Sequence, residues 1–245
     1  SLIGLRVAGL NPDRFARMAV GNGSLPAIPA GFQPYPPVEN PDEIVDLPLP
    51  FGAIPAQQMP FYDGCDLLFP GETDFGSWMD YAMKARSFRP SEVLEALTWF
   101  DLPDAEEAAY DAPYPSRVYM AGPRVFPSLV NEVGGTTTEA LAGLAAYTKP
   151  FITIWAANDP GNLGQCATQT ALAQLVPGSF GQDHVRLPEA SHFLQDDQGA
   201  EIARRLVEFY SSDPVDPPVP LTRGSRYCEI LLVEMAGTGL EAEVW

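Results

Sequence analysis

Basic residues, cysteines and long apolar runs are all scarce in this sequence. Only 14 lysines and arginines stand against 32 aspartates and glutamates, so the net charge is −18. Phosphate backbones and anionic lipid surfaces repel such a charge, so we expect neither a nucleic acid nor a membrane as a partner. No run of about 18 apolar residues is present, so we expect no membrane-spanning helix. The three cysteines are too few and too far apart for a disulfide framework or a metal cluster, and we expect no metal and reduced thiols at Cys65, Cys166 and Cys228.

Apolar residues make up 46% of the chain, enough for one sizeable α/β domain with an insertion. Residues 149–210 are the most informative stretch. KPFITIWAANDP reads as an apolar strand that ends before Pro160, and residues 165–175 have the spacing of a helix. A short strand is predicted over 185–187 and an amphipathic helix over 200–210. Strand, helix, strand and helix in this order predict a parallel βαβα unit.

Two titratable residues follow the two strands of this unit. Asp159 lies at the carboxyl end of the first strand, and His192 lies in the turn after the second. Catalytic groups of open α/β sheets gather at these strand ends, so the pair predicts the acid and the base of a nucleophile–acid–histidine triad. The carboxylate would fix the imidazole tautomer while the other ring nitrogen takes a proton. From spacing alone, a helix-capping aspartate and a packed histidine are the structural alternative.

The first 70 residues contain a helix and strand pattern followed by a proline-rich stretch. A buried helix over 1–10, in which Gly4 and Gly9 allow close backbone approach, and a strand over 15–22 predict part of a doubly wound sheet. Eleven prolines then fall between positions 26 and 70. This density excludes long helices and central strands, but the large apolar residues among the prolines favour an ordered, irregular wrap over a flexible linker.

Helical patterns dominate the middle of the chain. Three helices are predicted over 75–86, 92–100 and 104–111, and Asp104 is a candidate N-cap of the third. The segment that follows them, 118–131, is expected to be a loop. A helix over 138–147 would then lead back to the core. We therefore predict a cap over the strand ends, where it excludes water and contacts a ligand. The segments are core (1–26), Pro-rich wrap and helical cap (27–116), core (117–212), and a Pro-rich linker with a hairpin tail (213–245).

Four segments together resemble the haloalkane dehalogenases of the α/β-hydrolase superfamily, over about residues 1–210. LIGLRVAGLNPDRFARMAVGN is similar to the helix and strand that follow the family's nucleophile. AEEAAYDAPYP and YMAGPRVFPSLV resemble the end of its cap and the return to the core. KPFITIWAANDPGNLG resembles the strand with the catalytic acid, and PEASHFLQDDQGAEIARRLVEFY resembles the histidine turn and last helix. The resemblance implies an α/β-hydrolase fold with an inserted helical cap. The chain would contain the C-terminal part of the core sheet and lack the N-terminal strands.

The resemblance also implies a hydrolase that converts a haloalkane to an alcohol and a halide. An aspartate displaces the halide and forms an alkyl ester, and His192, held by Asp159, activates the water that hydrolyses this ester. Trp78 in ETDFGSWMDY matches a halide-binding indole of the family, and an indole N–H is a donor suited to an anion. The partners would be a small apolar halogenated substrate, the halide ion and water, with no cofactor. The apolar pocket would be lined by Phe75, Phe126, Leu163 and Phe193.

Several interpretations stay open. Packing between cap and core is the alternative role for Trp78, Phe75 and Phe126, while Trp99 and Trp155 are expected in the core and His184 at the surface. The family's nucleophile would precede Ser1, so we expect a fragment that is inactive alone. The competing functions are a serine esterase, a non-catalytic binding protein of the same fold, and an epoxide hydrolase using two lid tyrosines from among Tyr62, Tyr81, Tyr110, Tyr114 and Tyr119.

Overall fold

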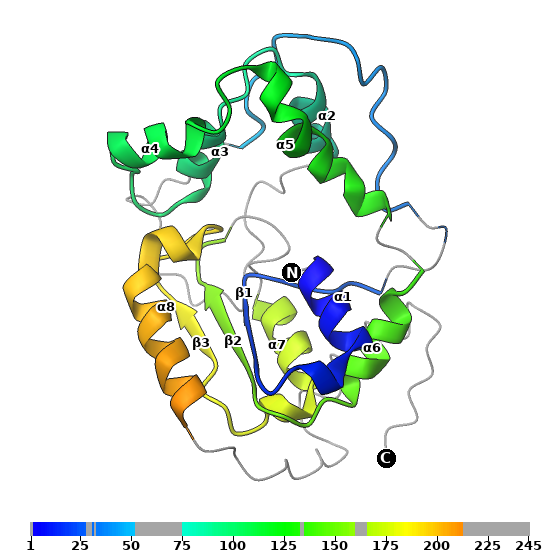
Figure 1. Cartoon of the computed structure of the whole chain (residues 1–245), viewed down its shortest axis with the longest axis vertical. Helices are drawn as coiled ribbons and strands as arrows, with labels where there is room; N and C mark the ends of the chain where they lie inside the picture. Colours follow the sequence, from blue (N-terminus) through cyan, green and yellow to red (C-terminus); the bar gives the residue numbers. More distant parts are fainter. Residues whose placement is uncertain are drawn as a thin grey trace.

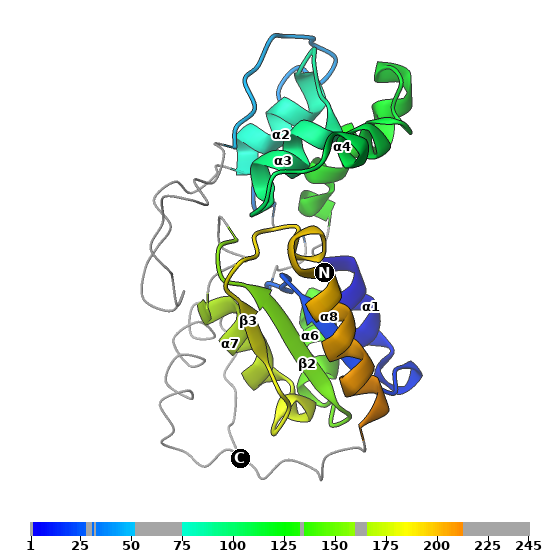
Figure 2. The same cartoon turned by 90° about the vertical axis from the view of Figure 1, so that its left-hand side faces the viewer.

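The computed structural model describes residues 2–27, 31, 33–51, 75–132, 135–159 and 166–212. These residues form a lower core built around a parallel sheet and an upper group of helices (Figure 1). We call the upper group, residues 33–51 and 75–132, the cap. In the view turned by 90°, the cap again lies above the core, over the upper ends of the strands (Figure 2). The predicted hairpin tail and most of the predicted Pro-rich wrap fall outside the described residues.

Three parallel strands form the sheet of the core. They pair in the order β1-β2-β3, with β2 in the middle, and their bounds are β1 (Met18–Gly21), β2 (Phe151–Ala156) and β3 (Val185–Leu187). Every residue of β2 is buried, as expected for a strand with covered faces and a paired strand on each side. The strand predicted over 185–187 and the parallel βαβα unit are confirmed, and the strand predicted over 15–22 is confirmed for residues 18–21.

Helices cover both faces of this sheet. Side chains of β2 alternate between the faces, so Phe151 and Trp155 point to one side and Ile152 and Ile154 to the other. The second side packs on α8 (Leu194–Ser211). The first side packs on three helices, which lie opposite α8 in Figure 1: α1 (Leu2–Leu10), α6 (Thr137–Ala145) and α7 (Cys166–Leu175). This layering is the doubly wound α/β arrangement that the sequence predicts.

The helices α1 and α6 touch through glycine. A Cβ atom on Gly9 would lie 2.7 Å from the carbonyl carbon of Ala140, and Gly143 meets the Gly9 backbone from the other side. The predicted close approach at Gly9 is therefore confirmed. The same prediction for Gly4 is wrong, because no atom of the described residues lies within 4 Å of the place where its Cβ would be.

The last helix begins earlier than its amphipathic pattern predicts. Its main part buries Phe209 and half-buries Ile202 and Leu206 against the sheet, as the pattern indicates. One further turn, 194–197, precedes this part and is separated from it by non-helical backbone at Gln198. That first turn follows His192 directly and faces the cap.

Six helical segments make up most of the cap. They are α2 (Phe75–Lys84), α3 (Pro90–Leu97), α4 (Asp104–Asp111), η2 (Arg117–Met120), α5 (Ala121–Val125) and η3 (Phe126–Glu132). The loop predicted over 118–131 is therefore wrong, because this segment is helical. Its Arg124 is buried and donates to the carbonyls of Ala82 and Ala85 at the end of α2. The cap thus continues to Glu132, beyond the predicted boundary at 116, and the chain returns to the core at α6.

Two further predictions concern the ends of cap elements. Asp104 does not cap α4, because the helix begins at Asp104 itself and Pro103 occupies the N-cap. The wrap is ordered where the structure describes it. Val45 bridges to Ala85, and Lys84 donates to the Glu39 carbonyl at 3.1 Å, so residues 33–51 pack along the end of α2 without regular structure.

Candidate active site

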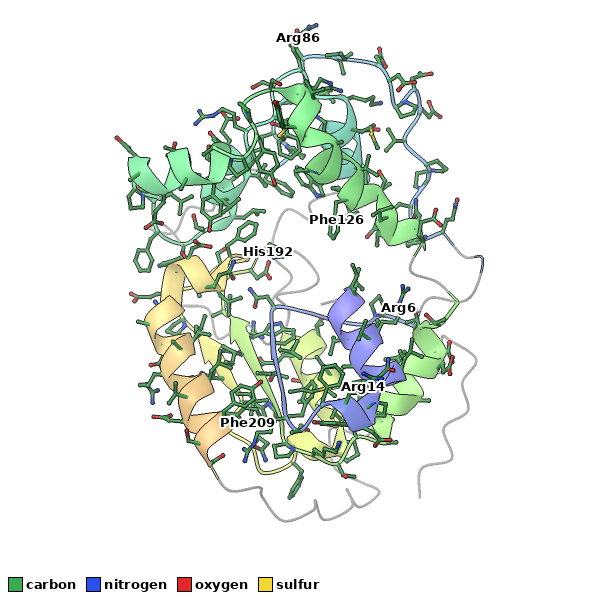
Figure 3. The ribbon with its side chains drawn as sticks, viewed as in Figure 1. Arg6, Arg14, Arg86, Phe126, His192 and Phe209 are labelled. Atoms are coloured by element: carbon green, nitrogen blue, oxygen red, sulfur yellow. The ribbon has the colours of Figure 1, made fainter. Side chains whose placement is uncertain are left out.

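The carboxyl ends of the three strands bring three polar residues to one edge of the sheet. Asn22 follows β1, Asp159 follows β2 by three residues, and His192 lies in the turn between β3 and α8. This edge faces the cap, and Figure 3 shows His192 at the top of the core. Parallel strands all end at the same edge, so residues far apart in the sequence meet there.

Asp159 and His192 are in contact, as predicted. The Nδ1 atom of His192 lies 3.0 Å from each carboxylate oxygen of Asp159. The Asp159 side chain is fully buried, whereas 34% of the His192 side chain is exposed. With Nδ1 donating to the carboxylate, Nε2 is the ring nitrogen that can accept a proton from a reactant. The geometry therefore suits a base whose tautomer is fixed by an acid.

The surroundings of His192 act on its pKa in opposite directions. Burial disfavours the charged imidazolium and is the largest effect, but the charge of Asp159 and its hydrogen bond to Nδ1 together outweigh it, so the pKa of His192 is raised above its ordinary value. A raised pKa makes the ring a stronger base toward a proton delivered at Nε2. It also stabilises the imidazolium that forms when this proton arrives.

Two asparagines hold the backbone around this pair, and sequence reasoning missed both. The side chain of Asn22 donates to the carbonyls of Ser191 at 2.9 Å and His192 at 3.1 Å, and its Oδ1 accepts the backbone N–H of Ala156 at 2.7 Å. Asn158, next to the acid, donates to the Ala190 carbonyl through its backbone and its side chain. The turn that carries His192 is thus tied to the end of β2. Polar residues directly after a predicted strand, as in MAVGN, were the available signal.

The predicted pocket residues are only partly brought together. Phe193 packs its ring edge-on against His192, with centroids 5.2 Å apart. Phe126 is 61% exposed, and Figure 3 shows it pointing from the cap toward the core. Phe75 instead packs on the ring of Tyr35 inside the cap, with centroids 4.9 Å apart. Leu163 lies outside the described residues.

Trp78 lies in an aromatic cluster within the cap. Its ring centroid is 5.1 Å from that of Phe51, 5.9 Å from that of Tyr81 and 5.7 Å from that of Phe88. Packing alone accounts for a large ring in this place, as the structural alternative holds. Its halide-binding role stays a prediction.

The second histidine is not a surface residue, so that prediction is wrong. His184 is partly buried beside β2, where its Nδ1 accepts the backbone N–H of Thr153 at 3.1 Å and its Nε2 lies 2.9 Å from the Ser179 carbonyl. Burial lowers the pKa of His184, although the Ser179 carbonyl and Asp183 oppose this. A neutral ring that accepts at Nδ1 and donates at Nε2 satisfies both contacts, so His184 is a structural residue.

No group of three or more histidine, cysteine, aspartate or glutamate residues in the described part of the chain could hold a metal ion. No helix among the same residues has the length and apolar character to cross a membrane.

Comparison with curated proteins finds haloalkane dehalogenases. The chain is 32% identical over 214 residues to haloalkane dehalogenase 1 of Mycobacterium tuberculosis (strain ATCC 25618 / H37Rv), covering 85% of this chain and 57% of that protein. It is 29% identical over 222 residues to a haloalkane dehalogenase of Psychrobacter cryohalolentis, covering 87% of this chain and 58% of the relative. The chain therefore spans a little over half the length of these relatives. No family model matches the sequence.

Solved structures with a similar fold include one that carries the same family name. The haloalkane dehalogenase DbeA from Bradyrhizobium elkani superposes with a TM-score of 0.50 at 18% identity, covering 86% of this chain and 65% of that one. A structure of DbjA gives a TM-score of 0.51 at 17% identity, covering 87% of this chain and 67% of that one. At such low identity these structures establish the fold and no more. By its fold the chain is an α/β-hydrolase core with a helical cap, and its sequence is similar to those of haloalkane dehalogenases over 85% to 87% of its length.

Proposed function

We propose that this chain carries the acid–base half of an enzyme that hydrolyses haloalkanes to an alcohol and a halide ion. The contact between the buried Asp159 carboxylate and Nδ1 of His192 is the observation that carries the proposal. The names of the curated relatives support the reaction, in which we assign the nucleophilic attack to an aspartate that is not among the described residues.

The two residues have separate roles in this reaction. The aspartate nucleophile attacks the carbon that bears the halogen, the carbon–halogen bond breaks, and an alkyl ester and a halide ion result. His192 then takes a proton from water at Nε2 while the water oxygen attacks the ester carbonyl, which releases the alcohol and regenerates the carboxylate. Asp159 stabilises the imidazolium through the hydrogen bond to Nδ1.

The substrate and the halide site belong to the same proposal. The exposed ring of Phe126 and the ring of Phe193 beside His192 support an apolar substrate, and the names of the curated relatives support a halogenated one. We assign the halide to the indole N–H of Trp78, which donates without accepting. The halide would then lie against the aromatic cluster of the cap.

The test uses the full-length protein that contains this chain and a bromoalkane such as 1-bromobutane. We expect halide release in wild type, and in His192→Ala a single turnover that leaves an alkyl ester on the protein, detected as a mass increase. Loss of the first step in His192→Ala, with no ester formed, would contradict the assigned role. Absence of halide release from a folded wild-type protein would overturn the proposed reaction.

Trp78 has its own test. Trp78→Phe keeps the aromatic packing and removes the N–H donor, so it should weaken bromide binding measured by fluorescence quenching. The loss of one hydrogen bond to a charged group, on the order of 1.5–3 kcal/mol, corresponds to roughly 10- to 150-fold in affinity. Equal bromide affinity in Trp78→Phe and wild type would return Trp78 to a packing role.

An epoxide hydrolase is less well supported, because two of its candidate lid tyrosines have other partners. The Tyr81 side chain is buried and its hydroxyl donates to the Ser87 carbonyl at 3.2 Å. The Tyr110 hydroxyl donates to Asp196 at 2.7 Å, and this hydrogen bond raises the pKa of Tyr110 to about 12. Hydroxyls engaged in this way are poorly placed to donate to an epoxide oxygen.

A further inference from the structure

Asp197 connects the cap to the turn that carries His192. It lies in the first turn of α8, and its Oδ2 accepts the backbone N–H of Ser191 at 2.8 Å. Its Oδ1 accepts two backbone N–H groups of the cap, that of Trp99 at 2.8 Å and that of Phe100 at 3.1 Å. One carboxylate therefore joins the residue before His192 to the loop between α3 and α4.

The surroundings of Asp197 make this joint a defined structure. The backbone N–H of Phe193 donates to the carbonyl of Leu97 at 3.3 Å, which closes a second link between the histidine turn and the cap. Non-helical backbone at Gln198 separates the first turn of α8 from the rest of the helix, so the carboxylate lies on a short turn of its own. Two links between the same two segments fix their relative position more firmly than one.

The histidine turn depends on its backbone groups for its position. Ser191 is fully buried, and its hydroxyl has no hydrogen-bond partner among the described residues. The backbone of Ser191 is held instead from two sides, by Asn22 at its carbonyl and by Asp197 at its N–H. Loss of either hydrogen bond would shift the peptide between Ser191 and His192, and the His192 ring would move with it.

Burial and hydrogen bonding act on the pKa of Asp197 in opposite directions. Burial raises the pKa of the Asp197 carboxyl, although its hydrogen bonds from the Ser191, Phe100 and Trp99 backbone oppose this. Hydrogen bonds to an ionised acceptor are about twice as strong as neutral ones. Burying a carboxylate here costs more desolvation free energy than burying a neutral side chain, and the three N–H donors offset part of this cost.

We propose that Asp197 is a positioning residue that couples the seating of the cap to the alignment of His192, through its hydrogen bonds to Ser191, Trp99 and Phe100. This inference rests on the proposed hydrolytic function. While the loop between α3 and α4 is seated, the carboxylate fixes the Ser191 peptide, and the His192 ring is held against Asp159. When the loop leaves, Asp197 loses two of its three partners and the histidine turn loosens.

The decisive variant is Asp197→Asn in the full-length protein, with Asp196→Asn as the matched control. An asparagine keeps the size of the side chain, but one carboxylate oxygen becomes an NH₂ group. This group is a donor that faces a backbone N–H, so the hydrogen bond at this position is lost. Asp196 lies next to Asp197 and binds the cap through Tyr110, so its variant removes the same charge and weakens one cap contact, because an amide oxygen can still accept from the Tyr110 hydroxyl. The bond to the Ser191 N–H stays intact in this control.

We expect Asp197→Asn to lower kcat for bromide release from 1-bromobutane by about tenfold to hundredfold, as for the loss of a charged hydrogen bond, with a smaller change in KM. The titration of His192, followed by NMR, should shift in Asp197→Asn and stay at the wild-type position in Asp196→Asn. A purely structural link would leave the His192 titration in place in both variants. That result would overturn the proposal.

Hydrogen exchange in the unmodified protein tests the coupling without any variant. The amides of Ser191, Trp99 and Phe100 should open together, with the same free energy of opening. Independent opening of Ser191 would overturn the coupling, even if Asp197→Asn does not fold. The titration and the exchange need no turnover, so a protein that releases no halide but shows both results would disprove the proposed function and keep the coupling.

Discussion

Replacement of Gly9 by alanine tests the packing of α1 on α6, which covers one face of the sheet. An added Cβ would lie 2.7 Å from the Ala140 carbonyl carbon and 2.9 Å from its Cα, and closer still to the oxygen. All three atoms are backbone, so no side chain can rotate away, and we place the cost of overpacking at the upper end of its usual range, about 3 kcal/mol. The better helix propensity of alanine returns about 1 kcal/mol.

The expected net loss for Gly9→Ala is therefore about 2 kcal/mol, or roughly 4–8 °C in Tm for a chain of this size. Gly4→Ala is the matched control, since Gly4 lies in the same helix and, in the part of the chain that the structure describes, no atom lies within 4 Å of its Cβ position. This control should gain about 1 kcal/mol from helix propensity. Urea denaturation followed by circular dichroism measures both. Equal stability of the two variants would refute the close approach of α1 and α6.

Two further predictions concern polar residues at the core. Asn22→Ala should destabilise the fold by about 2–4 kcal/mol in urea denaturation, because the buried N–H of Ala156 and the carbonyls of Ser191 and His192 lose a partner; a loss below about 0.5 kcal/mol would contradict this clamp. His184 has a lowered pKa in the folded protein, so the unfolded chain binds its proton first as the pH falls, and His184 should reduce stability below about pH 6.5, at most by roughly 1.4 kcal/mol per pH unit. The loss should be smaller in His184→Gln, and an identical pH dependence in both proteins would count against it.

Local patterns were sufficient to predict the core sheet. The apolar run that becomes β2 and the short strand β3 have turn residues on both sides, and the fold buries all of β2 and Leu187 of β3. Asp159 and His192 could be paired in advance because parallel strands end at a common edge. Their contact follows from topology, which the order of strands and helices already contains.

The cap was harder to predict, because its structure depends on contacts between distant segments. The stretch 118–131 contains glycine and prolines and reads as a loop, yet it forms short helical turns because Arg124 and Arg117 bind carbonyls at the end of α2. The role of Asn22 was missed for the same reason. Its partners lie 134 and 169 residues away, and no local pattern in the sequence specifies them.

The titration of the two histidines tests the central claim most directly. The chain has two histidines, so NMR of labelled imidazole rings can follow both, and His184→Gln assigns the signals. In the wild-type chain we expect His192 to titrate above the ordinary value of about 6.5, since the Asp159 charge outweighs burial. In Asp159→Asn burial acts without that charge, so the pKa of His192 should fall below its wild-type value. An unchanged pKa of His192 in Asp159→Asn would contradict the pairing of acid and base.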